Sequence, residues 1–202
     1  MTLRKLLCYS SFVLLLSAQQ VQAQQPLSAN RGHSHNDYKQ NIPLLRAYYA
    51  GMGSIEADVF FRNGQLFVAH ELKEINPDAT LKGQYLAPLF KLFKQNGNHP
   101  YAGPGLKLQL VIDIKEDHQH VLPQLVKELK PYMEMVRQGN QPDGISIVIS
   151  GDMPIPAHFK DYPDFITYDG RPATVYTIEE LKRVAMISDE LSRYTTWNGK
   201  GT

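Results

Sequence analysis

Acidic residues stand inside two apolar segments of this chain, where the side-chain pattern predicts β-strands. Glu56 and Asp58 lie two positions apart in residues 54–61, so both point to one face of an extended chain. Asp113 lies near the end of a second apolar run, residues 106–114. Burying an unpaired carboxylate is costly, so each needs a cation, an ion pair or solvent. Three carboxylates meeting at strand ends would suit a hard divalent cation, Mg²⁺ or Ca²⁺, which prefers oxygen ligands.

Simpler roles for these carboxylates stay open at this stage. Glu56 and Asp58 could face solvent from an edge strand, and Asp113 could pair with Lys115 two positions along. Both patterns in one chain favour a shared site, because parallel barrel strands bring their carboxyl ends to one mouth.

The histidines differ in their predicted positions. His70 ends a strand that returns from the hairpin signal Asn63-Gly64, which brings it back beside Glu56 and Asp58. His33 and His35 lie at the expected end of a first strand. Imidazole titrates near neutral pH, so two histidines facing a metal-bound phosphate could act as general base and general acid. The other histidines are expected to be solvated: His99, His118, His120 and His158.

Strands and helices alternate along the chain. Helical spacing marks residues 42–50, 85–93, 121–136 and 179–183, with Pro131 expected to divide the third helix; further buried strands are expected at 144–150 and 165–168. This alternation predicts an α/β fold with a parallel sheet, first as a TIM-type (β/α) barrel and second as an open doubly wound sheet. No glycine-rich phosphate loop opens a helix, which argues against a nucleotide-binding sheet.

The order of these motifs resembles a known group of enzymes. His35, Ile55-Glu56-Ala57-Asp58-Val59, Val68-Ala69-His70 and Val111-Ile112-Asp113-Ile114-Lys115 resemble the phosphatidylinositol-phospholipase-C-like phosphodiesterase superfamily, which includes glycerophosphodiester phosphodiesterases and sphingomyelinase D enzymes. The string His33-Ser34-His35-Asn36-Asp37-Tyr38 is similar to the branch typified by the yeast altered-inheritance-of-mitochondria protein 6.

The resemblance implies a TIM-type barrel with one divalent cation held by Glu56, Asp58 and Asp113. It also implies an acid–base pair of His70 with one histidine of the His33-Ser34-His35 string, of which His35 is favoured and His33 stays the alternative. Lys115, Asn36 and His33 would lie on the substrate side. The substrate would be a small-molecule or lipid phosphodiester, cleaved by hydrolysis or through a cyclic phosphate. The chain departs from the glycerophosphodiesterase pattern, because His-Ser-His-Asn replaces a His-Arg-Gly opening and its phosphate-facing arginine.

The first 23 residues have the layout of a secretory signal peptide. Arg4 and Lys5 precede a short apolar run, and Val21-Gln22-Ala23 is a small-x-small cleavage pattern. Cleavage would remove Cys8, the only cysteine, and would leave a secreted or periplasmic domain, residues 24–202, without a membrane span. A complete barrel typically needs ~250 residues, so we expect this one to be incomplete at its C-terminus.

The remaining charge is close to balanced. Without Arg4 and Lys5 the chain has 19 basic and 20 acidic residues, a formal net charge of −1. No basic run supports nucleic-acid binding.

Two other functions compete with the phosphodiesterase. His33-x-His35 could be the metal-binding pair of an amidohydrolase or PHP-type phosphoesterase, although such sites use further histidines at later strand ends, which are missing here. A secreted binding barrel with structural calcium would keep the carboxylates without needing flanking histidines.

Overall fold

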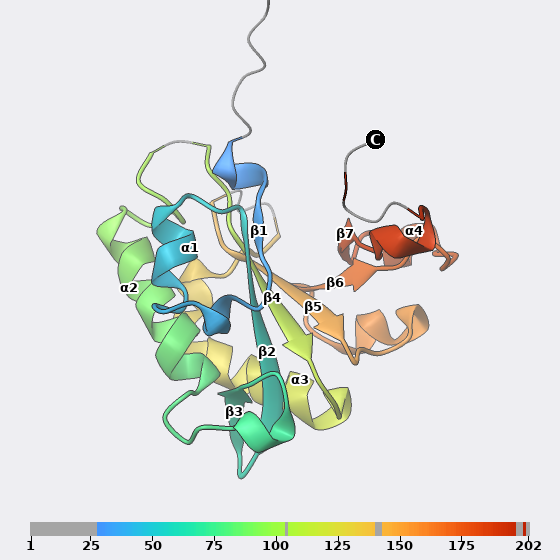
Figure 1. Ribbon diagram of the computed structural model, residues 1–202, viewed down its shortest axis with the longest axis horizontal. Helices are drawn as coiled ribbons and strands as arrows, with labels where there is room; N and C mark the ends of the chain where they lie inside the picture. The colour runs from blue at the N-terminus through green and yellow to red at the C-terminus, as the bar shows by residue number, and fades with distance from the viewer. Residues whose placement is uncertain (1–27, 104, 140–142, 197–199, 201–202) are drawn as a thin grey trace, which may run out of the picture.

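The computed structural model describes residues 28–103, 105–139, 143–196 and 200 (Figure 1). The predicted leader, residues 1–23, and its Cys8 lie outside this part. The strands are β1 (His33–Ser34), β2 (Ser54–Arg62), β3 (Gln65–Val68), β4 (Gln109–Ile114), β5 (Ser146–Gly151), β6 (Ile166–Gly170) and β7 (Val184–Ile187). The helices are α1 (Leu45–Tyr49), α2 (Ala87–Gln95), α3 (His118–Leu129) and α4 (Ile178–Leu181), joined by short 3₁₀ and π segments.

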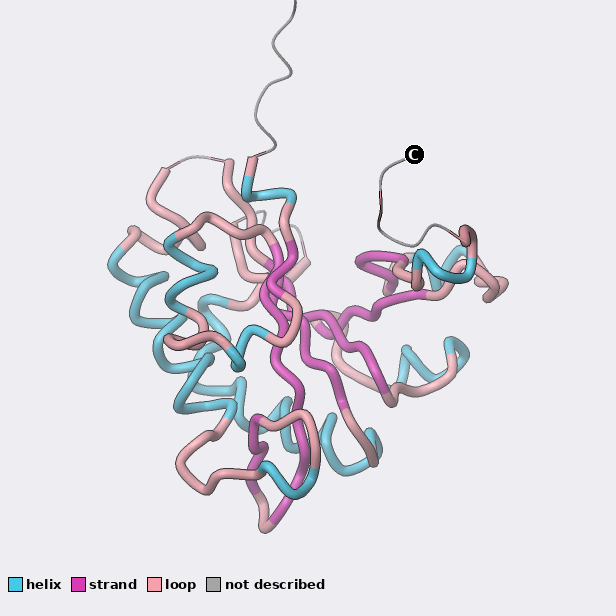
Figure 2. The backbone as a smooth tube through the Cα atoms, in the orientation of Figure 1, coloured by secondary structure: helices cyan, strands magenta, loops and turns pink. Residues whose placement is uncertain are grey.

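The described strands form one sheet, drawn in magenta in Figure 2. Their order is β1-β2-β4-β5-β6-β7, with every neighbouring pair parallel, and β3 pairs antiparallel with β2. The predicted α/β fold with a parallel sheet is therefore confirmed. β1 and β7 stand at opposite ends of this order, so the described sheet is open and barrel closure is not confirmed.

The hydrophobic core lies between one face of the sheet and the helices. Ile55, Ala57 and Val59 of β2 are fully buried there with apolar side chains of β4, α2 and α3. In Figure 1, α1 and α2 lie together on one side of β2. Because strand side chains alternate, Glu56 and Asp58 take the opposite face. They are nevertheless only 7% and 0% exposed, so both carboxylates must find partners within the fold.

A tight hairpin joins β2 and β3. Asn63 and Gly64 both have positive φ, 50° and 77°, as a type I′ turn requires. The pairing of Val59 with Val68 carries the chain back so that the Ala69 N–H donates to the Asp58 carbonyl (3.2 Å). The hairpin predicted from Asn63-Gly64 is thus confirmed, and it delivers His70 beside Asp58.

The helix boundaries follow local chemistry. The helix predicted for 121–136 is α3 followed by a 3₁₀ segment, Lys130–Met135, and Pro131 lies at the change because its nitrogen has no hydrogen to donate. The helix expected over 42–50 is shorter, and Leu44 precedes it with φ 63°. No helix among the described residues is both long and apolar enough to cross a bilayer.

Candidate active site

A row of polar side chains crosses the sheet at one level. Asp58 of β2 is in register with Asp113 of β4, and Asp113 with Ser150 of β5. Neighbouring parallel strands lie about 4.8 Å apart, so side chains at matching positions on one face are neighbours. The Ser150 hydroxyl donates to Asp113 Oδ2 (2.9 Å), which fixes the carboxylate on one side.

Lys115 joins the two aspartates. Its Nζ lies 2.5 Å from Asp58 Oδ2 and 2.9 Å from Asp113 Oδ1. Burial alone would lower the pKa of Lys115, but hydrogen bonds and the negative charges of Asp58 and Asp113 outweigh it, so this pKa is raised. The lysine is therefore a fixed cation throughout the neutral range. The pairing of Asp113 with Lys115 considered from the sequence is present, and Asp58 shares it.

Asp58 is also the anchor for two side chains of neighbouring loops. The Tyr38 hydroxyl donates to Asp58 Oδ2 (2.7 Å), and His70 Nδ1 lies 2.9 Å from the same oxygen. Burial and the hydrogen bond to Asp58 raise the pKa of Tyr38, which keeps it a neutral donor. With Asp58 accepting at Nδ1, the Nε2 atom of His70 is the ring nitrogen left to meet a substrate.

Glu56 interacts with both histidines of the His33-Ser34-His35 string. His33 Nε2 is 2.9 Å from Glu56 Oε2, and its Nδ1 is 2.7 Å from the Ser54 hydroxyl. His35 Nε2 is 3.5 Å from Glu56 Oε1, and this ring is 71% exposed. Both nitrogens of His33 are thus occupied, whereas His35 is held at one end and is free to turn.

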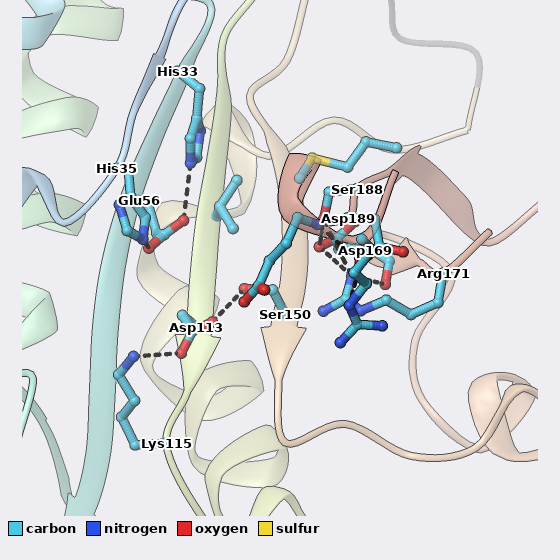
Figure 3. A pocket seen from close by; sticks show the side chains of 14 residues that line it. His33, His35, Glu56, Asp113, Lys115, Ser150, Asp169, Arg171, Ser188 and Asp189 are labelled. Carbon is cyan, nitrogen blue, oxygen red and sulfur yellow. Dashed lines mark hydrogen bonds and ion pairs between the residues drawn. The ribbon is translucent and has the colours of Figure 1, made fainter. Parts of the chain in front are cut away.

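Several of these side chains line a cavity of about 500 Å³ (Figure 3). Its walls include His33, His35, Glu56, Asp113 and Lys115. Ser150 and residues of β6 and β7 form the other side. His70 is absent from the described wall, since it lies on the β3 side of Asp58. The structure therefore places five of the eight predicted site residues on the described wall. Asp58, Asn36 and His70 lie outside it, and Asp58 links His70 to the wall through Lys115.

The carboxylates have some, but not all, of the features of a metal-binding site. Asp58 Oδ1 is buried without a described protein partner, and Glu56, Asp58 and Asp113 present only oxygen atoms, as Mg²⁺ and Ca²⁺ prefer. Within the described residues, however, no three His, Cys, Asp or Glu side chains are grouped closely enough to hold a metal ion. The Lys115 ammonium takes the position between Asp58 and Asp113 instead. The donor chemistry fits a hard cation, provided that Lys115 shares those two carboxylates with it.

His118 and Asn36 make contacts that the sequence did not predict. His118 was expected to be solvated, which is wrong: its backbone N–H and its Nδ1 both bond to Asp152, 34 positions away, and the ring is 22% exposed. Asn36 has φ 49°, and its Oδ1 lies 3.1 Å from the Tyr38 hydroxyl, whose single hydrogen it shares with the closer Asp58. Asn36 therefore supports the tyrosine, while its proposed substrate contact stays a prediction.

The sequence reasoning missed the residue that shapes the histidine loop. Asp37 is fully buried, and its carboxylate accepts from Ser34 Oγ (2.8 Å), the Leu44 N–H (2.5 Å) and the Tyr85 hydroxyl (3.0 Å). These bonds hold the loop that carries His33 and His35. No spacing rule marks Asp37, because its partners come from a turn and from a distant segment.

Polar residues of the opposite wall were also missed. Asp169 of β6 is 3% exposed, and it binds Arg171 Nη1 (2.6 Å) and the Ser188 hydroxyl (2.6 Å). A sequence signal existed, because Asp169-Gly170-Arg171 has the same acid-x-cation spacing as Asp113-Ile114-Lys115.

Fold and site define a parallel α/β domain with carboxylate, histidine and lysine side chains gathered on one face of its sheet. A family model described as the AIM6-like phosphodiesterase domain matches residues 22–155, two thirds of the chain. The chain belongs to this family, and its domain is of the phosphodiesterase type.

Curated relatives agree with this assignment. The altered inheritance of mitochondria protein 6 homolog of Arthroderma benhamiae is 33% identical over 148 residues, covering 61% of this chain and 47% of that protein. Altered inheritance of mitochondria protein 6 of Kluyveromyces lactis is 29% identical over 165 residues, 64% of this chain and 39% of the relative. The chain thus spans less than half the length of these relatives. No solved structure matches the chain.

Proposed function

We propose that this protein is a metal-dependent phosphoric diester hydrolase acting on a glycerophosphodiester or phospholipid-like substrate. The observation that carries this proposal is a cluster of carboxylates, Lys115 and His35 on one face of the parallel strands, beside one cavity. Asp58 and Asp113 lie in register toward the carboxyl end of β4, and Glu56 lies one turn of the pleat before Asp58. Active sites of parallel α/β barrels use this end of the sheet.

The charge around the cavity supports the need for a cation. Five carboxylates and three fixed cations line the described wall, and Asp58 adds a sixth carboxylate through Lys115. A phosphodiester carries a negative charge and would be repelled by this surplus. A divalent cation held by Glu56, Asp58 and Asp113 would offset most of this negative charge and stabilise negative charge on the phosphoryl oxygens.

His70 has the environment of a general base. Asp58 accepts from Nδ1, which leaves a lone pair on Nε2 to take the proton of a water or a neighbouring hydroxyl as it attacks phosphorus. Asp58 also stabilises the imidazolium that results. Tyr38 supports this pair by donating to the same carboxylate oxygen.

His35 is suited to donate the proton to the departing oxygen. Among the described residues only Glu56 pairs with it, at Nε2, and its exposed ring can turn toward the cavity. His33 has both nitrogens engaged and instead positions Glu56. Lys115 lies beside the same carboxylates and can donate to a phosphoryl oxygen without losing its charge.

The barrel is part of the proposal. The strand order follows the chain without reversal, whereas an open doubly wound sheet reverses its order at the ligand site. We also retain the proposed leader over residues 1–23, which would place the domain outside the cytoplasm.

The test is hydrolysis of glycerophosphodiesters and of a chromogenic phosphodiester, with Mg²⁺ or Ca²⁺ and with chelator. His70→Ala and His35→Ala are each expected to lower kcat by about 10²–10⁴-fold, the usual contribution of general acid–base catalysis. His158→Ala is the matched control, since His158 also pairs with an aspartate (Asp161, 2.7 Å) but is not part of the cavity wall. Activity that is indifferent to chelator would refute the metal-dependent mechanism.

A further inference from the structure

A second acid-x-cation pair lies at the end of β6. Asp169 and Arg171 are two positions apart, like Asp113 and Lys115 at the end of β4, and both pairs line the same cavity. Ser150 of the intervening strand lies between them in Figure 3.

Arg171 is held firmly by one end of its guanidinium. Its Nη1 bonds Asp169 Oδ2 (2.6 Å), the Ser188 hydroxyl (3.2 Å) and the carbonyls of Asp169 (3.3 Å) and Gly170 (3.1 Å). Every one of these bonds, within the described part of the chain, uses Nη1. The Nε and Nη2 donors are therefore available to a ligand, on a side chain that is 38% exposed. An arginine fixed in this way can receive a carboxylate or phosphate with little further ordering.

The two cations are bound on opposite sides of the cavity. Lys115 leans toward β2, where it bridges Asp58 and Asp113, while Arg171 is tied to Ser188, just beyond β7 (Figure 3). The Lys115 ammonium lies between β2 and β4, and the Arg171 guanidinium lies between β6 and β7, which is three strand spacings along the sheet. At about 4.8 Å a spacing, the two charged groups are roughly 10–14 Å apart when sheet curvature is allowed for. A single phosphate is too small to contact both.

We propose that Arg171, set by Asp169 and Ser188, binds a second acidic group of the substrate, a carboxylate or a phosphate, on the wall opposite Lys115. The inference rests on the proposed function, in that the group near Lys115 is taken to be the phosphodiester. It makes the preferred substrate a phosphodiester with an additional negative charge on one of its alcohol parts.

The test uses two probes that differ by one carboxylate, glycerophosphoserine and glycerophosphoethanolamine. Their binding to the full chain is measured by calorimetry with Ca²⁺, and their turnover is measured separately. The wild-type protein is expected to bind glycerophosphoserine at least 10-fold more tightly. Arg171→Gln is expected to remove this preference while changing the affinity for glycerophosphoethanolamine less than 3-fold.

Arg193→Gln is the matched control, because Arg193 lines the same cavity but is 65% exposed and paired with Asp189. A general charge effect would make both variants lose the preference equally, and this result would overturn the proposal. Absence of any preference in the wild-type protein would overturn it as well.

Two further outcomes separate the possible failures. Should Arg171→Gln not fold, Arg171→Lys, which keeps the charge beside Asp169, is expected to lose at least 3-fold of the preference. Preference in binding without turnover of either probe would refute the proposed hydrolase and leave the second acidic subsite standing.

Discussion

Replacing Lys115 with Met tests whether a metal ion and the lysine compete for the same carboxylates. The Lys115 ammonium lies 2.5 Å from Asp58 and 2.9 Å from Asp113, two of the three proposed metal ligands. Methionine keeps most of the length and apolar body of lysine but has no charge. We expect the variant to bind Ca²⁺ or Mg²⁺ more tightly than the wild-type protein, and to lose turnover.

The magnitude follows from the bonds that the metal ion must disturb. A hydrogen bond to a charged group contributes about 1.5–3 kcal/mol. Metal binding that breaks one such bond of Lys115 loses this much binding free energy. The variant has no such bond to break, so it should bind the metal ion about 10–100-fold more tightly. Without metal the variant should be less stable by about 2–4 kcal/mol, because Asp58 then stays buried with no fixed cation beside it.

The assay is calorimetric titration of each cation, together with thermal unfolding in chelator and at saturating metal. A 30-fold gain in affinity is worth about 2 kcal/mol, so added metal should raise the Tm of the variant by about 4–8 °C more than that of the wild-type protein. Lys182→Met serves as control, because Lys182 pairs with Glu179 on α4 away from the cavity. Equal or weaker metal binding by Lys115→Met would refute the competition, and no binding to either protein would refute the metal site.

Three smaller predictions test the surroundings of the site. Tyr38→Phe removes a hydrogen bond to buried Asp58 and should lower the unfolding free energy by about 1 kcal/mol. It should also lower kcat by about 10-fold, because a small displacement of a catalytic group reduces the rate steeply. An unchanged kcat would contradict the supporting role of the tyrosine. Gly151→Ala places a Cβ 2.3 Å from a carbonyl of β4 at φ 73°, and should cost over ~2 kcal/mol in urea unfolding. Gly139→Ala is the control, because Gly139 has φ 49° and no described atom within 4 Å of the added Cβ; equal costs would contradict the clash. Asp152 caps α3 by accepting from the His118 backbone N–H. Burial alone would raise the pKa of Asp152, but the hydrogen bonds from the start of the helix outweigh it and lower this pKa. The stability that the ionised carboxylate contributes is therefore present above the ordinary carboxyl pKa of 3.8 and is lost as pH falls through the lower pKa of the folded protein. Asp152→Asn should therefore cost about 0.5–1 kcal/mol near neutral pH, kept small by solvent exposure, and almost nothing in acid; a cost independent of pH would argue against the charge.

The parts of the site that lie on regular strands could be predicted from sequence. Glu56 and Asp58 share a face because strand side chains alternate, and His70 returns to them because Asn63-Gly64 specifies a tight hairpin. The placement of Asp113 needed only the assumption that neighbouring strands are parallel.

The parts held by irregular backbone could not be predicted. Asp37 and Tyr38 act from a loop in which Asn36 and Leu44 both have positive φ. Asparagine tolerates this conformation, but leucine seldom adopts it, so no sequence pattern announces the turn at Leu44. His118 was misjudged because its partner, Asp152, follows a different strand, and no local pattern links them. The barrel was inferred from alternation of strands and helices, which fixes the order of layers but not whether the sheet closes.

The polar row across β2, β4 and β5 also determines how these strands can align. Away from that row, residues 110–112 and 147–149 are interchangeable aliphatic side chains, Leu-Val-Ile and Ile-Val-Ile, which would pair comfortably in several registers. Sliding β4 by one residue would turn Asp113 into the apolar layer beneath α3, and sliding it by two would part Asp113 from Ser150 and Lys115 from Asp58. The charged residues thus favour one strand register over the others. A substitution of Asp113 or Lys115 would therefore remove interactions of the site and also reduce the energy difference between the native register and the shifted ones.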